Sequence, residues 1–166
     1  MEIIEILLDH DLLKFSREDL LDGEVFSKNM RDARLLETRY LSQEFETGQK
    51  VEVIRVLDSP KERYHIQHPY DEKIEGDIIG CYTRPEIEIL LIIAEGHYSQ
   101  FKKTHLKPNE YCKQYIPKFI PRKVKIKIKG FITSYFSNPQ TLVQTLQFYH
   151  QIRANKNELT IYSLLK

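Results

Sequence analysis

The stretch TRPEIEILLIIAEG, residues 83 to 96, joins two acidic residues to the longest apolar run in the chain. The uninterrupted apolar residues 89–94 predict a helix over about 84–95 that is buried on most of its surface. Glu86 and Glu88 stand at the start of this helix. A carboxylate next to such apolar neighbours needs an explanation, because burying a charge is costly without a partner.

A structural and a functional interpretation compete for these acids. Thr83 and Glu86 have the spacing of a capping box, in which each residue bonds to the backbone of the other and Thr83 caps the helix. That interpretation leaves Glu88 unexplained. Glu88 is either on a narrow exposed seam or buried beside a metal site or an arginine. We expect it to be at least partly buried and to face the carboxyl end of the first strand.

Hydrophobic periodicity predicts the other elements. Strands are expected at about 2–8, 50–58, 62–67, 77–83 and 123–129. Helices are expected after the Ser16–Asp19 cap, over 27–46, from Pro108, over 139–154 and at the C-terminus. This order indicates an α/β fold with a small, partly parallel sheet, flanking helices and a more irregular C-terminal half. The first strands should be parallel, with the 27–46 helix across one face.

Charge is distributed unevenly within what the length predicts to be a single domain, residues 1–166. Residues 1–98 hold 12 Lys and Arg against 22 Asp and Glu, a net charge of −10, and form the predicted acidic α/β core. Residues 99–130 hold ten Lys and Arg against one acid, a net charge of +9. We expect residues 99–166 to form a basic, mainly helical extension. Such a segment suits nucleic acid or an acidic protein partner, unless the two halves neutralise each other.

Asp9 and Asp11 follow the predicted strand 2–8. Residues two apart in a strand share a face, so both carboxylates would point the same way at a carboxyl strand end, where ligands of open sheets bind. A pair of carboxylates there suits Mg²⁺. The alternative is a solvated loop in which Asp11 caps the segment that follows.

Lysines alternate with β-branched residues in KVKIKIK, residues 123–129. Lys123, Lys125, Lys127 and Lys129 would project from one face of a strand, about 7 Å apart, and could bind phosphates while nearby aromatic side chains stack on bases. The alternative is an edge strand whose lysines prevent aggregation.

The order LLDHD, helix, strands and PEIEILLII resembles the later half of a Toprim-like domain, and most of all RloB-like proteins of bacterial defence and mobile elements. The resemblance covers about residues 3–95. It implies that Asp9 and Asp11 bind Mg²⁺ and that Glu88 matches the glutamate of the second motif. The sequence departs from this pattern in lacking the upstream EGxTE-like motif and the aromatic residues of the second motif. Glu86, or a residue of another chain, would have to replace the missing catalytic glutamate.

Several other sites have no sequence support. No HxxxH or HExxH spacing points to zinc, and no P-loop, dinucleotide loop or nucleophile elbow is present. The acidic N-terminus and the short apolar runs predict a cytoplasmic protein without a membrane segment. Two hypotheses remain. One is a Mg²⁺-dependent nuclease-like enzyme, or a relic of one, acting on nucleic acid in host defence or a mobile element. The other is a non-catalytic binding or accessory protein.

Overall fold

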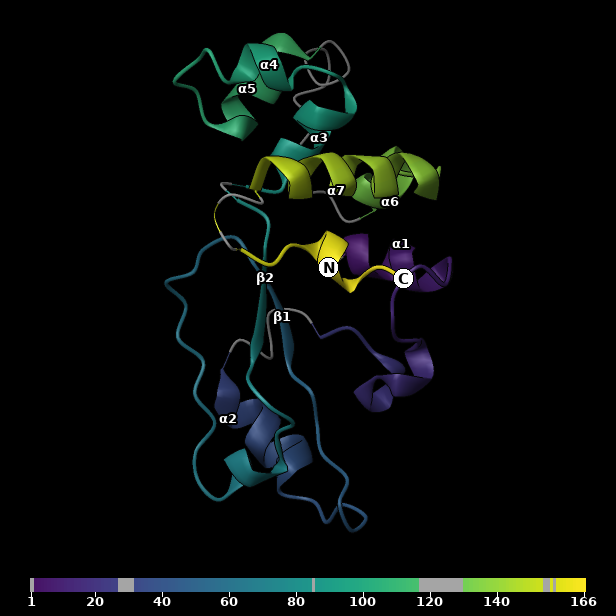
Figure 1. The fold of residues 1–166 in the computed structure, drawn as a ribbon, viewed down its shortest axis with the longest axis vertical. Helices are drawn as coiled ribbons and strands as arrows, with labels where there is room; N and C mark the ends of the chain where they lie inside the picture. Colours follow the sequence, from purple (N-terminus) through teal and green to yellow (C-terminus); the bar gives the residue numbers. More distant parts are fainter. Residues whose placement is uncertain (1, 27–31, 85, 117–129, 154–155, 157) are drawn as a thin grey trace.

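The computed structural model describes residues 2–26, 32–84, 86–116, 130–153, 156 and 158–166. Its sheet consists of strands β1 (Ile54–Leu57) and β2 (Ile79–Tyr82), which pair in parallel with Ile54 opposite Ile79 and Leu57 opposite Tyr82. Helices flank this sheet (Figure 1). The mixed α/β class with a small parallel sheet is therefore confirmed. The parallel pair joins the strands near 54–57 and 79–82, whereas the expected parallel pairing of the first strands, 2–8 and 50–58, does not form.

The helices are numbered in chain order, and the two strands lie between α2 and α3. The α-helices are α1 (Glu2–Asp9), α2 (Ala33–Leu36), α3 (Glu88–Ala94), α4 (Tyr98–Phe101), α5 (Pro108–Tyr115), α6 (Phe131–Tyr135) and α7 (Pro139–Arg153). The 3-10 turns are η1 (Arg17–Asp19), η2 (Leu21–Gly23), η5 (Tyr70–Lys73) and η7 (Ile161–Leu164), and a π-helical turn, η4 (Glu37–Leu41), continues α2.

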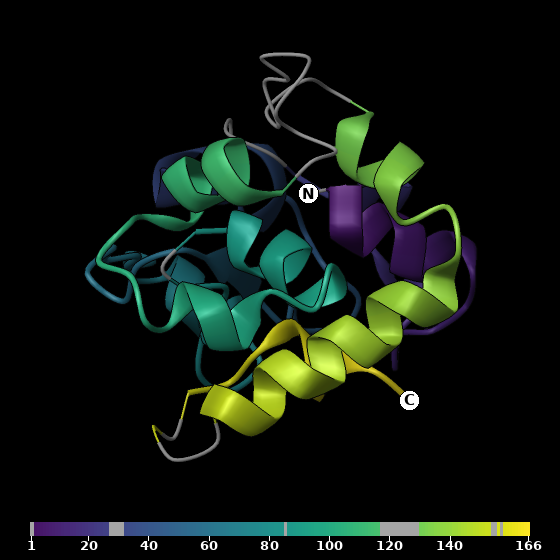
Figure 2. The ribbon, with the colours of Figure 1, turned by 90° about the horizontal axis from the view of Figure 1, so that it is seen from above.

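Helix α3 lies at the centre of the larger core. Residues 89–92 are at most 2% exposed and are therefore buried on every side of the helix. Helices α4, α5 and α7 pack against α3, and Figure 2 shows α7 crossing beside it. Helix α1, α6 and the C-terminal turn η7 contribute to the same apolar cluster. The all-round hydrophobicity of α3 thus requires neighbours on all faces.

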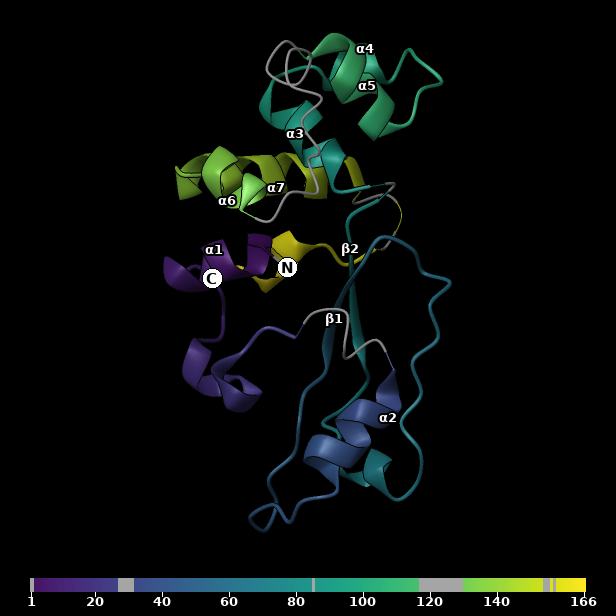
Figure 3. The same cartoon turned by 180° about the vertical axis from the view of Figure 1, so that it is seen from behind.

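A second, smaller core lies at the opposite end of the molecule from α4 and α5 (Figure 3). It joins α2 and η4 to two residues of the loop that connects the strands, Ile66 and Ile74. Glu37, which is also buried, accepts a hydrogen bond from the backbone N–H of Gln67 at 2.7 Å. This bond ties the helical turn to the loop and satisfies the buried carboxylate.

The prediction of a strand at 2–8 is wrong, because these residues form α1. A short continuous apolar run fits a buried strand and a buried helix equally well. The acids distinguish the two: Glu2, Glu5 and Asp9 recur at the three- and four-residue spacing of one helical face. That face is partly solvent-exposed, while Ile3, Ile4, Ile6, Leu7 and Leu8 are buried.

Two other elements differ from expectation. The helix predicted over 27–46 spans only 33–41 of the described residues, and no strand forms at 62–67. The strands within 50–58 and 77–83 are confirmed, as are the helices starting at Pro108 and Pro139. The strand predicted at 123–129 lies outside the described residues.

Truncating the centre of α3 tests the importance of its burial. Leu91→Ala removes a side chain that is 0% exposed, so we expect a loss of about 2–5 kcal/mol in the free energy of unfolding, measured by urea denaturation. Leu35→Ala in α2, at 45% exposure, is the matched control and should change this free energy by less than about 1 kcal/mol. Equal losses in the two variants would contradict the central role of α3.

Candidate functional site

Asp9 and Asp11 lie at the C-terminal end of α1, on the protein surface. The Asp9 carboxylate accepts a hydrogen bond from Arg17 at 2.6 Å, and Arg17 also binds Glu5 at 2.6 Å. Asp11 forms an ion pair with Lys166 at 2.6 Å. Each carboxylate therefore faces a different basic side chain, and the two do not meet as they would at a strand end.

Asp11 has a conformational role in ending α1. Its φ of 52° places it in the left-handed region. The N–H of Asp11 binds the carbonyl of Leu8 at 3.0 Å, and the N–H of Leu12 binds that of Leu7 at 2.9 Å. These two bonds make a Schellman motif, in which Asp11 takes the position usually held by glycine. The structure thus accounts for Asp11 through helix termination.

The capping box predicted for Thr83 and Glu86 does not form. Helix α3 begins at Glu88, and the residue before it, Ile87, caps it without a side-chain bond. The N–H of Thr83 donates instead to the carbonyl of Leu57 at 2.9 Å, which extends the pairing of the two strands. Sheet pairing therefore determines the conformation of Thr83, and the prediction that it caps a helix from about residue 84 is wrong.

Glu86 and Glu88 line a pocket of about 380 Å³ that also reaches Asp58, Thr83 and Glu2. Glu88 is 4% exposed, which confirms its predicted burial. The pocket lies where the carboxyl ends of β1 and β2 meet, the usual place for a ligand in a parallel sheet.

The pocket does not contain Asp9 or Asp11. It reaches α1 at its first residues, Glu2 and Ile3. Glu88 therefore faces the N-terminal end of α1, whereas the sequence predicted that it faces the carboxyl end of this segment. Among the described residues, no group of three or more His, Cys, Asp or Glu side chains is arranged to hold a metal ion.

Sequence reasoning missed Glu2 and Asp58 as pocket residues. Asp58 directly follows the predicted strand 50–58, and that position was a usable signal. Glu2 was hidden within the predicted first strand. Its carboxylate accepts hydrogen bonds from the N–H groups of Gly130 and Thr133 at the start of α6, at 2.9 and 3.1 Å. Burial opposes ionisation, but these backbone bonds outweigh it and lower the pKa of Glu2.

An ionic network fixes the segment that leads into the pocket. Glu158 binds Arg84 at 2.5 Å and also pairs with Arg153 of α7. The Tyr149 hydroxyl accepts a bond from the Arg84 N–H and donates to its carbonyl, at 2.6 and 3.0 Å. Burial would raise the pKa of Glu158, but the guanidinium groups of Arg153 and Arg84 outweigh it and hold that pKa below its ordinary value.

The two thiols do not provide a nucleophile. Burial raises the pKa of Cys81 to about 11. Burial and the carboxylates of Glu88 and Glu86 raise that of Cys112 to about 12. Both are therefore protonated at neutral pH, whereas the thiolate is the reactive form.

The basic segment is described as far as residue 116. Four of its lysines are exposed on or beside α4 and α5: Lys102, Lys103, Lys107 and Lys113. No ion pair joins any of the four to a carboxylate of the described part of the chain. Lys123, Lys125, Lys127 and Lys129 lie outside the described residues.

Comparisons of the chain with protein-family models, with curated proteins and with solved structures gave no match. None of the helices in the described ranges is long and apolar enough to cross a membrane.

The Glu158 network predicts an acid-sensitive contribution to stability. The pKa of Glu158 is lower in the folded state than its ordinary value of 4.5. The stabilisation is therefore fully present above pH 4.5 and is lost as the pH falls through the lower folded-state pKa. Glu158→Gln should reduce the free energy of unfolding at pH 7 and flatten its dependence on pH below 4.5, measured by urea denaturation at several pH values. Glu46→Gln, an exposed acid, is the control. An unchanged pH profile in Glu158→Gln would contradict the network.

Proposed function

We propose that the protein is a non-catalytic nucleic-acid-binding protein that uses its basic segment, residues 99–130, to contact phosphates. The observation that carries this proposal is the state of the four described lysines, which are exposed and have no carboxylate partner among the described residues. Internal neutralisation by the acidic half would require such pairs. A lysine that stays hydrated can exchange its counterions for phosphates.

Aromatic rings accompany these lysines, and one of them is exposed. Tyr115, at the end of α5, is 51% exposed and rests on the buried Tyr111 ring, with 4.9 Å between ring centroids. The Lys102 ammonium lies 6.0 Å from the Tyr98 ring centre in α4. Tyr98 is half-buried, so the exposed Tyr115 is the ring available for stacking on an unpaired base while the lysines contact phosphates.

The enzymatic alternative, a Toprim-like Mg²⁺-dependent phosphodiesterase, has less support in the geometry. A shared metal would require Asp9, Asp11 and Glu88 to converge, with carboxylate oxygens roughly 4–5 Å apart for ligand distances near 2.1 Å. The two aspartates pair with Arg17 and Lys166 instead, whereas Glu88 lines the pocket at the other end of α1. A role in host defence or a mobile element belongs to the same resemblance and is likewise a hypothesis.

Salt dependence tests the proposed binding. Lys103→Ser with Lys113→Ser should flatten the slope of log affinity against log salt concentration on double-stranded DNA by up to about two units. Each lysine–phosphate contact contributes about 0.9 to that slope. Changing Lys123, Lys125, Lys127 and Lys129 together to Ser should flatten it by up to about three or four units. Fluorescence anisotropy with labelled DNA, single- and double-stranded, measures both slopes.

The matched control changes two exposed lysines elsewhere, Lys61→Ser with Lys156→Ser, and should leave the slope unchanged. No binding by the parent protein at low salt would contradict the proposal. So would equal slopes in the control and in both basic-segment variants. If the protein bound an acidic protein but no DNA, the partner of the basic segment would be an acidic protein and the proposed nucleic-acid binding would be wrong.

A nuclease assay separates the binding protein from the enzyme. We expect the parent protein to bind DNA without cleaving it when MgCl₂ is added, because Asp9 and Asp11 pair with Arg17 and Lys166 and do not line the pocket that contains Glu88. Gel electrophoresis of the DNA after incubation provides the measurement. Cleavage that requires Mg²⁺ and disappears in the Asp9→Ala, Asp11→Ala double variant would instead establish the enzymatic hypothesis.

A further inference from the structure

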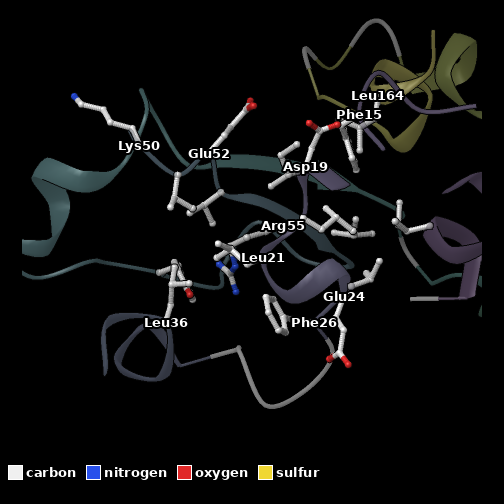
Figure 4. Close-up of a pocket in the computed structure, with 18 of the residues that line it drawn as sticks. Phe15, Asp19, Leu21, Glu24, Phe26, Leu36, Lys50, Glu52, Arg55 and Leu164 are labelled. Carbon is white, nitrogen blue, oxygen red and sulfur yellow. The ribbon is translucent and has the colours of Figure 1, made fainter. Parts of the chain in front are cut away.

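We infer that the outer edge of β1 is a docking groove for an extended peptide whose apolar and basic side chains alternate. The groove has a volume of about 540 Å³ and runs beside residues 49–57. Segment 15–26 forms much of its other wall (Figure 4). No residue of the basic segment lines this groove, so the inference is independent of the proposed nucleic-acid binding. The groove shares only Val56 and Leu57 with the pocket at Glu88.

The backbone of this edge is available for pairing. The carbonyls of Val53 and Leu57 accept bonds from the β2 side, at 2.9 Å each, and Val51 bonds to the loop that precedes β2. Successive residues of a strand point their N–H and C=O groups in opposite directions. The backbone groups of Ile54 and Val56, and of Lys50 and Glu52 before them, therefore face the groove.

Those outward groups have no backbone partner among the described residues. No hydrogen bond outside the sheet ladder satisfies Glu52, Ile54 or Val56 in the described part of the chain. The opposite edge of the sheet is covered, because the N–H of Tyr82 binds the carbonyl of Leu159 at 2.8 Å. The open edge from Lys50 to Val56 is about 20 Å long at 3.3 Å per residue, which suits a peptide of roughly seven residues. Strand addition to such an edge is a general mode of peptide recognition.

The groove walls specify alternate apolar side chains. Most of the lining residues are apolar, among them Phe15, Leu20, Val25, Phe26, Leu36, Phe45 and Leu164. An added strand presents every second side chain to one face. A flat polar ligand, or a peptide without this alternation, would leave the apolar walls exposed to water.

The rim specifies basic residues at the other positions. Asp19, Glu24 and Glu52 line the groove, and no described cation forms an ion pair with them. Of the two basic residues in the lining, Arg55 already binds Glu62 at 3.2 Å and lies over the Tyr64 ring. Lys50 is the other. The rim is therefore acidic, and a basic peptide complements it.

Synthetic peptides test the inference on the full chain. A seven-residue peptide of alternating Lys and Val should bind, and the matched peptide of alternating Glu and Val should not, as measured by fluorescence anisotropy. N-methylation of alternate amides should abolish binding in one of the two possible registers and leave it intact in the other, because only one set of N–H groups faces β1.

Charge variants locate the binding on the groove. Glu24→Gln with Glu52→Gln should lower the affinity for the Lys–Val peptide by about fivefold, because two exposed ion pairs with the peptide are lost. Glu46→Gln, an exposed acid outside the groove, should leave the affinity unchanged. The same variants should leave DNA binding unchanged, so failure here is distinguishable from failure of the proposed function.

Four results would overturn the inference. The first two are that neither peptide binds, and that N-methylation in either register leaves binding intact. The third is that the Glu24→Gln, Glu52→Gln double variant and the Glu46→Gln control bind the Lys–Val peptide with equal affinity. The fourth is that a second copy of the chain occupies the groove. The last would appear as a dimer in sedimentation that Val56→Pro converts to a monomer, with circular dichroism confirming that this variant folds. Val56→Pro removes one outward N–H and should otherwise weaken peptide binding alone.

Discussion

Burial of α3 on all of its faces is the constraint on which the rest of the structure depends. A helix without a polar face has to be enclosed, and α1, α5, α6, α7 and the C-terminal turn all contribute to the cluster around it. The first and last segments of the chain meet in this cluster, where Leu13 and Leu165 form an isolated bridge. Enclosing α3 also places its first residue, Glu88, at the carboxyl ends of the two strands.

The arrangement separates two kinds of surface. Helices α4 and α5 lie at one end of the molecule, away from β1 (Figures 1 and 3). These helices bear the exposed lysines, and the acidic residues of the groove lie beside β1. Because the four exposed lysines on or beside α4 and α5 form no ion pair with a carboxylate of the described residues, this basic surface and the acidic rim suit separate partners. A protein that joins a nucleic acid to a basic peptide would need such a separation, since a mixed surface would attract neither.

The wrong prediction of a strand at residues 2–8 had the largest consequence for the candidate site. Taken as a strand, residues 2–8 would bring Asp9 and Asp11 to a carboxyl strand end beside Glu88. As helix α1, they turn the aspartates toward Arg17 and Lys166 and bring Glu2 to the pocket instead. Periodicity of the apolar residues could not decide between these arrangements, because the run is too short and too continuous. The spacing of its acids contained the better signal.

The sequence by itself determined the local elements that have strong periodicity or clear punctuation. These are the strands near 54–57 and 79–82, the helix starts at Pro108 and Pro139, and the burial of the helix after Pro85. Tertiary structure decided the partners: Thr83 pairs with Leu57 instead of capping a helix, and Asp58 and Glu2 come to the same pocket from distant positions. The physical reason is that caps, ion pairs and pockets depend on which segments meet. The need to enclose α3 determines which segments meet, and no local sequence pattern does so.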